Sequence, residues 1–189
     1  MAENTKKRTL TKERLKNALI VLCDKKGYYD ITILDICKCA GVYRSTFYRY
    51  YDTKDDILRE IEHEYIEATQ SLTPTLWSVH AGASPEELEK YRRELTEDME
   101  YHQEHRQLCK FLLSPAGDIY FYNMMVESIG QQVTKNLQRR GIRETKKTDY
   151  LLNFVAAGFV STIHRWLQRN DRSPSEIADF LLSMILDLQ

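Results

Sequence analysis

Apolar residues recur along most of this chain at the spacing of an α-helix, and few residues interrupt the pattern. The last segment shows it most clearly, with apolar side chains at Ile177, Phe180, Leu181, Met184, Ile185 and Leu188. Residues three and four apart share one face of a helix, so this segment has a continuous apolar stripe. Only seven glycines and four prolines occur in the 189 residues. The sequence therefore predicts an all-α fold.

Start and stop signals place the individual helices. Near the N-terminus we expect helices over 11–25, 32–40, about 43–50 and 53–71, with Gly41 ending the second. After a loop or short helical piece at 77–83, we expect helices over 84–113, 118–140, 150–169 and 174–188. Ser84 and Ser173 each stand just before a proline and three residues before a glutamate, the arrangement of an N-terminal capping box.

Charge is distributed unevenly along the chain. Residues 1–51 hold seven Lys and four Arg against five acidic residues, a net charge of +6, which leaves −7 on the remainder of a chain whose net charge is −1. A basic segment is a candidate surface for a polyanion such as nucleic acid. A solvated helix face is the alternative explanation of such an asymmetry.

The cysteines and the lack of long apolar runs indicate the compartment. Cys23, Cys37, Cys39 and Cys109 lie within helical patterns and lack paired CxxC spacing, so we expect reduced thiols rather than disulfides or a zinc finger. No apolar run reaches the roughly 18–20 residues that span a bilayer, and the start MAENTKKRTL lacks the apolar core of a secretory signal. We expect a soluble cytoplasmic protein with no membrane partner.

Two short predicted helices meet at the residues Ala40–Gly41–Val42, as a helix-turn-helix requires. The glycine permits a sharp turn, and the valine closes the small core. Phe47 and Tyr51 are predicted to face inward, so the polar side of the second helix is free to enter a major groove. Helix starts at Thr32 and Lys54 flank it and offer backbone N–H groups to phosphates. A helix-turn-helix used only for protein contact is the alternative.

The segment TILDICKCAGVYRSTFYRYYDTK, residues 32–54, closely resembles the DNA-binding signature of the tetracycline-repressor (TetR) family. The resemblance covers about residues 10–60 and includes the AGV turn, the T-F-Y core and the lysine that opens the fourth helix. It implies an N-terminal three-helix DNA-binding domain over 1–53. Behind that domain it implies a helical effector-binding and dimerisation domain over 54–189.

The same resemblance implies a role for each matching position. Phosphate contacts fall to Thr32, Tyr48, Tyr50 and Lys54, and base contacts fall to Tyr43, Arg44 and Ser45. Thr46 and Arg49 complete the predicted DNA-binding set. Tyr43 stands where serine usually caps the helix, and Ser45 stands where glycine often lies close to DNA. Because of these two departures, the resemblance does not predict the operator sequence.

Residues 101–188 resemble the C-terminal region of regulators of the dihydroxyacetone-kinase type within the same family. The resemblance is carried by EHRQLCKFLLSPAGDIYFYNMM and AAGFVSTIHRWLQRNDRSPSEIADFL. We expect a homodimeric repressor that binds double-stranded operator DNA and responds to an unknown small-molecule effector. Some members of that subgroup activate transcription and take a protein partner. An activator or co-regulator controlled by a protein partner is therefore the alternative.

Aromatic and thioether side chains gather at 120–125 and indicate an effector pocket, with core packing as the alternative. The residues predicted to line the pocket are Trp77, Phe111, Tyr120, Phe121, Tyr122, Met125 and His164. The segment FVAAGFV, residues 154–160, is apolar on every side and needs neighbours beyond its own domain. We expect a four-helix dimer interface there. Its predicted residues are Ala156, Ala157, Gly158, Phe180, Leu181 and Met184.

One further cluster suggests metal chemistry. Asp98, His102, His105 and Cys109 stand at i, i+4, i+7 and i+11, so one helix face offers metal-ligand side chains. Such residues on one polar face are usually solvated, and we expect neither a metal nor another cofactor. The sequence contains no nucleophile elbow and no phosphate-binding glycine loop. We therefore expect no enzyme, and a metal-dependent enzyme is the disfavoured alternative.

Overall fold

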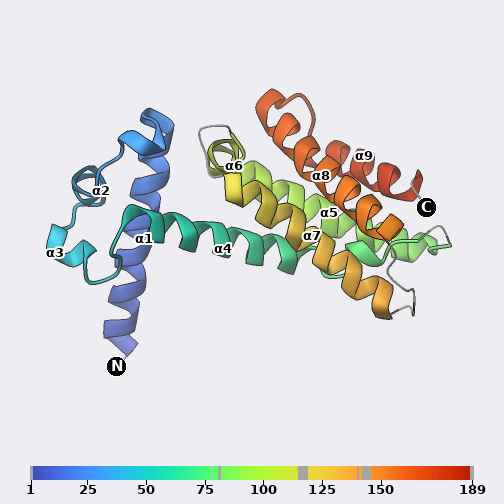
Figure 1. Cartoon of the computed structure of the whole chain (residues 1–189), viewed down its shortest axis with the longest axis horizontal. Helices are drawn as coiled ribbons and strands as arrows, with labels where there is room; N and C mark the ends of the chain where they lie inside the picture. Colours follow the sequence, from blue (N-terminus) through green and yellow to red (C-terminus); the bar gives the residue numbers. More distant parts are fainter. Residues whose placement is uncertain (1, 81, 115–118, 140, 142–145, 188–189) are drawn as a thin grey trace. The chain divides into compact units, whose positions relative to one another are not determined.

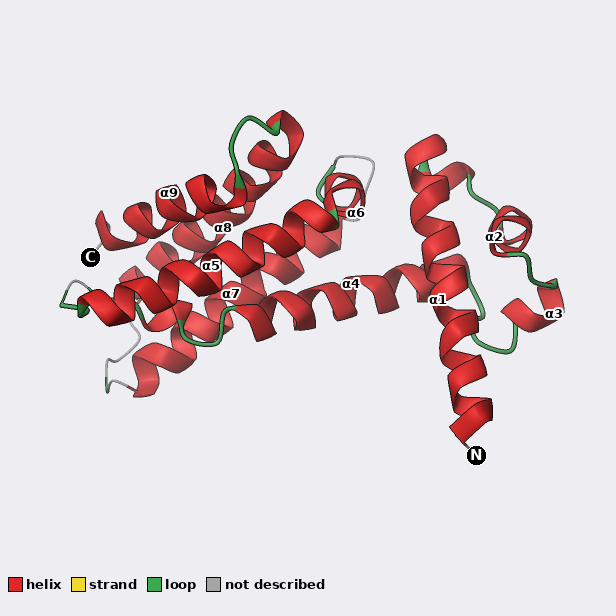
Figure 2. Ribbon diagram, turned by 180° about the vertical axis from the view of Figure 1, so that it is seen from behind, coloured by secondary structure: helices red, strands yellow, loops and turns green. Residues whose placement is uncertain are grey.

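The computed structural model describes residues 2–80, 82–114, 119–139, 141 and 146–187. All regular secondary structure in these residues is helical, as the apolar periodicity predicted (Figure 1). Where the connections between helices lie within these residues, they are short loops and turns (Figure 2). The chain divides into two compact units, Met1–Tyr65 and Ile66–Gln189.

The first unit contains three helices, a 3₁₀ turn and the start of a fourth helix. These are α1 (Ala2–Lys25), η1 (Tyr28–Asp30), α2 (Ile33–Ala40), α3 (Arg44–Phe47) and the first part of α4 (Lys54–Leu72). Its core is built from fully buried apolar side chains, among them Leu15, Leu19, Ile36, Phe47 and Ile57. α2 packs against both α1 and α3.

α1 begins at Ala2, whereas the sequence predicted a start at Thr11. Residues 2–10 contain neither glycine nor proline, so nothing in them stops a helix. Lys12 Nζ lies 2.6 Å from Glu60 Oε2 on α4 and ties this end of α1 to the unit. Thr11 therefore lies inside the helix.

The second unit holds the remaining helices. They are the end of α4, η2 (Leu76–Ser78), α5 (Pro85–Glu104), α6 (Arg106–Leu112), α7 (Ile119–Arg139), α8 (Lys146–Arg169) and α9 (Pro174–Asp187). α5 packs along α9, and α7 packs along α8. Leu95, Met99, Phe121, Val160 and Leu167 are fully buried in its core.

The helix predicted over 84–113 is in fact two helices, α5 and α6, which meet at His105. His105 has a φ of −96° and a ψ of 23°, outside the helical region. Its Nδ1 lies 2.9 Å from the carbonyl oxygen of Tyr101, and Arg106 Nε donates to the carbonyl oxygen of Leu167 at 2.7 Å. No glycine or proline lies at this position, so no local signal in the sequence predicts the break. The contact of Arg106 with α8 accompanies it.

Other boundaries differ by a few residues. α3 ends at Phe47 rather than Tyr50 because residues 48–50 continue as turns, in which the Tyr50 N–H donates to the Phe47 carbonyl at 2.9 Å. α8 begins at Lys146 rather than Tyr150. The predicted ends of α7, Asp118 and Arg140, lie outside the residues described. Among the helices described, none combines the length and apolar character that crossing a membrane demands.

Candidate nucleic-acid interface

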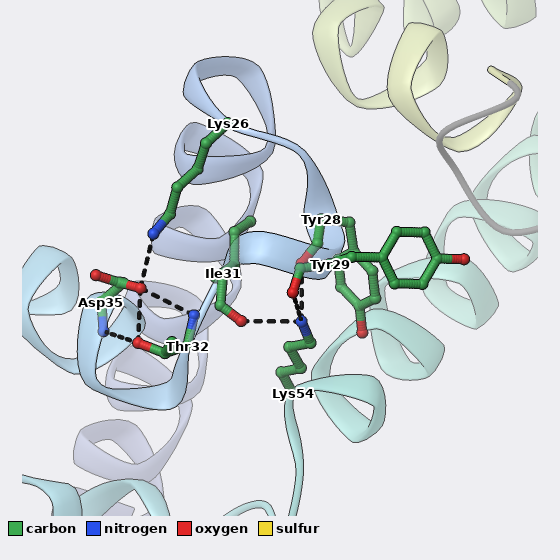
Figure 3. Close-up of polar contacts among 7 residues, drawn as sticks. All are labelled: Lys26, Tyr28, Tyr29, Ile31, Thr32, Asp35 and Lys54. Carbon is green, nitrogen blue, oxygen red and sulfur yellow. Dashed lines mark hydrogen bonds and ion pairs between the residues drawn. The ribbon is translucent and has the colours of Figure 1, made fainter.

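A reciprocal capping box fixes the start of α2. The Asp35 N–H donates to Thr32 Oγ1 at 3.2 Å, and the Thr32 N–H donates to Asp35 Oδ2 at 2.9 Å (Figure 3). Lys26 Nζ lies 2.7 Å from the same carboxylate oxygen. Hydrogen bonds from Lys26 and Thr32 stabilise the charged carboxylate and hold the pKa of Asp35 well below its ordinary value. α2 is thereby attached to the segment that follows α1.

The turn after α2 depends on Gly41. This residue has a φ of +63° and a ψ of 43°, a left-handed conformation that glycine adopts without strain. A Cβ atom at Gly41 would lie only 3.0 Å from Nη2 of Arg14. The Val42 N–H donates to the Cys37 carbonyl at 3.0 Å and completes the turn. The chain therefore enters α3 in a fixed direction.

The outward face of α3 and the turn after it carries hydrogen-bonding side chains. Tyr43 is 84% exposed and stands at the N-cap position without making a side-chain cap. Ser45 and Arg49 are exposed, whereas Thr46 and Tyr50 are half-buried. Phe47 and Tyr51 are buried, as the sequence predicted. The predicted reading face is thus accessible in this unit.

Arg44 and Tyr48 form a pair on that face. Arg44 Nη2 donates to Tyr48 Oη at 3.0 Å, and the guanidinium carbon lies 5.7 Å from the centroid of the Tyr48 ring. The contact combines a hydrogen bond with a cation–π interaction. Two residues one helical turn apart thus place a guanidinium and a phenol side by side on this face.

Lys54 at the start of α4 joins three carbonyl groups. Its Nζ donates to the carbonyl oxygens of Tyr28 at 2.8 Å, Ile31 at 2.9 Å and Tyr29 at 3.2 Å (Figure 3). Tyr28 Oη in turn donates to the carboxylate of Asp55. All three ammonium protons therefore have acceptors within the first unit. The resemblance implied a phosphate contact for Lys54, and that role stays a prediction.

A second capping box occupies the start of α4. The Thr53 N–H donates to Asp56 Oδ2 at 2.8 Å, and the Asp56 N–H donates to Thr53 Oγ1 at 3.3 Å. Acidic side chains therefore lie at the N-termini of both α2 and α4, where the sequence suggested free N–H groups for phosphates. A phosphate at the Thr32 hydroxyl must compete with the carboxylate of Asp35.

The second unit contains a pocket with about 350 Å³ of empty space, part of which opens to solvent. Of the predicted effector residues, Trp77 and Met125 line it, whereas Phe111, Phe121, Tyr120, Tyr122 and His164 do not. Tyr120 is 71% exposed, and Phe121 is buried in the core. Tyr122 Oη donates to the carbonyl oxygen of Ala157 at 3.2 Å, and His164 Nε2 lies 3.0 Å from Gln168 Nε2. The aromatic run at 120–125 thus spreads over several environments, because successive helical residues point in different directions.

Two of the polar residues that line the pocket, Asp98 and His102, belong to the set that the sequence suggested for metal binding. His102 Nε2 lies 3.5 Å from Asp98 Oδ2, and His102 Nδ1 lies 3.6 Å from Cys109 Sγ. The carboxylate and the thiol therefore approach opposite nitrogens of the imidazole and do not converge on one point. The residues described contain no group of three or more side chains arranged to hold a metal ion. The spacing of Asp98 and His102 in the sequence was the signal for this buried pair.

The predicted dimer residues fall into two groups. Ala156 and Leu181 are buried within the second unit itself, so they belong to its core. Phe180 and Met184 are each 44% exposed, Gly158 is exposed and Ala157 is half-buried. Phe154, the first residue of the apolar segment 154–160 but not among the six predicted interface residues, is 68% exposed on α8.

Two family models match the chain. The model for bacterial regulatory proteins of the tetR family matches residues 17–61, and the model for a transcriptional regulator C-terminal region matches residues 89–187. Among curated proteins, none matches this chain in sequence.

Solved structures share the fold along nearly the whole chain. A TetR transcriptional regulator from Streptococcus agalactiae 2603V is 24% identical, with a TM-score of 0.66 over 98% of both chains. The fatty acid degradation regulator FadR from Bacillus halodurans is 12% identical, with a TM-score of 0.63 over 92% of this chain and 93% of that chain. The dihydroxyacetone kinase operon activator DhaS is 16% identical, with a TM-score of 0.61 over 92% of this chain and 93% of that chain.

Proposed function

Because this chain belongs to the tetR family of bacterial regulatory proteins, we propose that it is a repressor that binds a palindromic operator as a homodimer. An effector held in the second unit changes its affinity for that operator. The function is one of binding, without a catalytic step. The observation that carries the proposal is the exposed polar face of α3, which the Gly41 turn and the Thr32–Asp35 capping box hold in a fixed direction.

On operator DNA, α3 and the turn after it enter the major groove. Tyr43, Arg44 and Ser45 contact base edges, and the Arg44 guanidinium suits the two acceptors of a guanine. Thr46 and Arg49 extend this contact surface. Phosphate contacts fall to three of the four residues predicted for them from the sequence, Thr32, Tyr48 and Tyr50. Lys54 contributes mainly by holding the start of α4 against the residues before α2.

α8 and α9 form the dimer interface in this proposal. Phe154, Phe180 and Met184 are large apolar side chains that remain exposed on these two helices, which contact each other. Exposed apolar residues that cluster on neighbouring helices mark an interaction surface. A Cβ atom at Gly158 would meet no atom within 4 Å, so packing inside this chain does not require a glycine there. Close approach of a partner helix does explain it.

α4 is the proposed connection between effector and DNA, because it contributes residues to both units. Two reading helices must lie about 34–36 Å apart to enter successive major grooves. An effector that favours one position of α4 changes this spacing. A coupling free energy of about 1–3 kcal/mol would change operator affinity roughly 5- to 150-fold.

The proposal is tested by selecting DNA fragments that the purified protein binds from the genome of its source, followed by footprinting. We expect fragments that share an inverted repeat, with two protected half-sites about one helical turn apart. Fragments without a common sequence, or a single protected half-site, would contradict a palindromic operator. The genes beside the selected fragments then narrow the choice of effector.

A further inference from the structure

Two buried polar atoms beside the pocket of the second unit have no hydrogen-bond partner among the residues described. Asp98 and Trp77 are 4% and 8% exposed, and both line the pocket. Within the described part of the chain, neither Asp98 Oδ1 nor Trp77 Nε1 has a hydrogen-bond partner. A buried donor or acceptor without a partner is destabilising, so native structures rarely retain one without a reason. Here one acceptor and one donor line the same pocket.

The charges around the pocket cancel. Burial lowers the pKa of His102, but the Asp98 carboxylate and the Cys109 thiol outweigh burial and raise it to about 10. Asp98 and His102 therefore form a carboxylate–imidazolium pair at neutral pH, with no net charge. The other lining residues are uncharged. A ligand with its own charge would have no counter-ion in the pocket, and burying an unpaired charge is strongly unfavourable.

The pocket is lined by both polar and apolar side chains. The enclosed part of the pocket has room for about one water-sized group. Ile129, Phe159 and Ile163 supply apolar surface on α7 and α8. Met125 also lines the pocket and has the flexibility to make way for a larger body.

We infer that this pocket takes a small uncharged molecule with a hydroxyl group on an apolar body. The hydroxyl donates to Asp98 Oδ1 and accepts from the Trp77 indole N–H, and the body packs against Phe159 and Ile163. One hydroxyl serves both unpaired atoms because it is a donor and an acceptor at once. This inference rests on the proposed function, since it names the class of effector for the same unit.

Four probes of nearly equal size test the head group directly: benzyl alcohol, toluene, benzoate and benzylamine. Each is titrated into the full chain by calorimetry without DNA. A Trp166→Phe variant leaves Trp77 as the remaining one of two tryptophans and reports occupancy by fluorescence. We expect benzyl alcohol to bind about tenfold or more tighter than toluene, as one hydrogen bond to a charged group implies. Equal binding of toluene, stronger binding of benzoate or benzylamine, or no binding of any probe would overturn the inference.

Two variants locate the effect. Asp98→Asn should reduce the preference for benzyl alcohol over toluene, because a neutral amide oxygen accepts a weaker hydrogen bond than a carboxylate. Glu94→Gln is the matched control, because Glu94 is a buried acid on the same helix whose carboxylate accepts hydrogen bonds from Thr75 and Leu76. It should keep the preference, and an equal loss in both variants would overturn the assignment.

If benzyl alcohol binds but operator affinity does not change, the pocket inference stands and the proposed effector control fails. If benzyl alcohol changes operator affinity while the Asp98→Asn variant keeps the preference, the proposed effector control stands and the pocket inference fails.

Discussion

Lys54 Nζ lies 2.8 Å from the carbonyl oxygen of Tyr28 and 4.5 Å from the centroid of the Tyr28 ring. One ammonium group thus joins the first residue of α4 to the 3₁₀ turn that precedes α2. Any shift of the start of α4 therefore acts on the residues that lead into the DNA-reading helices. The contact makes Lys54 a positioning residue in this structure.

Lys54→Met should lower the free energy of unfolding by about 1–3 kcal/mol, because carbonyl groups of Tyr28 and Ile31 lose their donor. Chemical denaturation measures this change, with Lys90→Met, an exposed lysine on α5, as control. Operator affinity should fall for every sequence alike. The slope of log affinity against log salt should stay nearly the same, whereas a direct phosphate contact would reduce it by about one.

Arg44→Ala should weaken operator binding by about 1–3 kcal/mol and relax the base preference at one position of each half-site. Tyr48→Phe removes only the hydroxyl that accepts from Arg44, so it should cause a smaller loss and keep the preference. Binding to a set of single-base operator variants measures both effects. The exposed Arg59, which pairs with Asp56, provides the control Arg59→Ala. The same loss in the Arg44 and Arg59 variants would remove Arg44 from the base-reading set.

The Asp98–His102 pair should make stability depend on pH. Its contacts raise the pKa of His102 in the folded chain to about 10, from an ordinary value of about 6.5. Between these values the folded state binds more protons than the unfolded state, so the free energy of unfolding falls as pH rises. The fall is at most about 1.4 kcal/mol per pH unit for one proton.

This dependence is best measured by urea unfolding between pH 7 and 8.5. A double variant, Asp98→Asn with His102→Asn, lacks the imidazole and its carboxylate partner and should show a flatter profile. Identical slopes in the two proteins would mean that the pair does not titrate in this range. The series stops at pH 8.5 because burial also raises the pKa of Cys23 in the folded chain, to about 12. At higher pH this thiol would titrate in the unfolded chain and add its own pH dependence.

Neighbouring residues on α9 separate the dimer interface from the core. Phe180 is 44% exposed, whereas Leu181 is 3% exposed. Phe180→Glu should give a folded monomer, and Leu181→Glu should unfold the second unit because it buries an unpaired charge. Sedimentation and circular dichroism together distinguish these results. A dimeric Phe180→Glu protein would place the interface on another surface.

The helices and the reading turn could be predicted from local signals in the sequence. Gly41 marks the turn, and Thr32 with Asp35 marks the start of α2, because backbone conformation and capping depend on a few adjacent residues. The break at His105 had no such signal. It accompanies contacts such as the one between Arg106 and Leu167, which lie far apart in the chain.

The candidate site was predictable only in part for the same reason. The exposed face of α3 follows from helical periodicity around the buried Phe47. The partners of Lys54 do not follow, because the carbonyls of Tyr28 and Ile31 precede it by more than twenty residues. Aromatic composition pointed to Tyr120 for the pocket, yet Tyr120 does not line it, whereas Asp98 and His102 on another helix do. Composition identifies residue types and does not show which of them face one cavity.

Sequence-specific recognition through α3 is tested most directly by the affinity of the purified protein for a selected operator and for a shuffled duplex of equal length. Fluorescence anisotropy measures both over a series of salt concentrations. We expect a dimer to bind the operator at least a thousandfold tighter than the shuffled duplex, with log affinity falling linearly with log salt for both. Equal affinity for the two duplexes, or binding that does not respond to salt, would contradict sequence-specific recognition through α3.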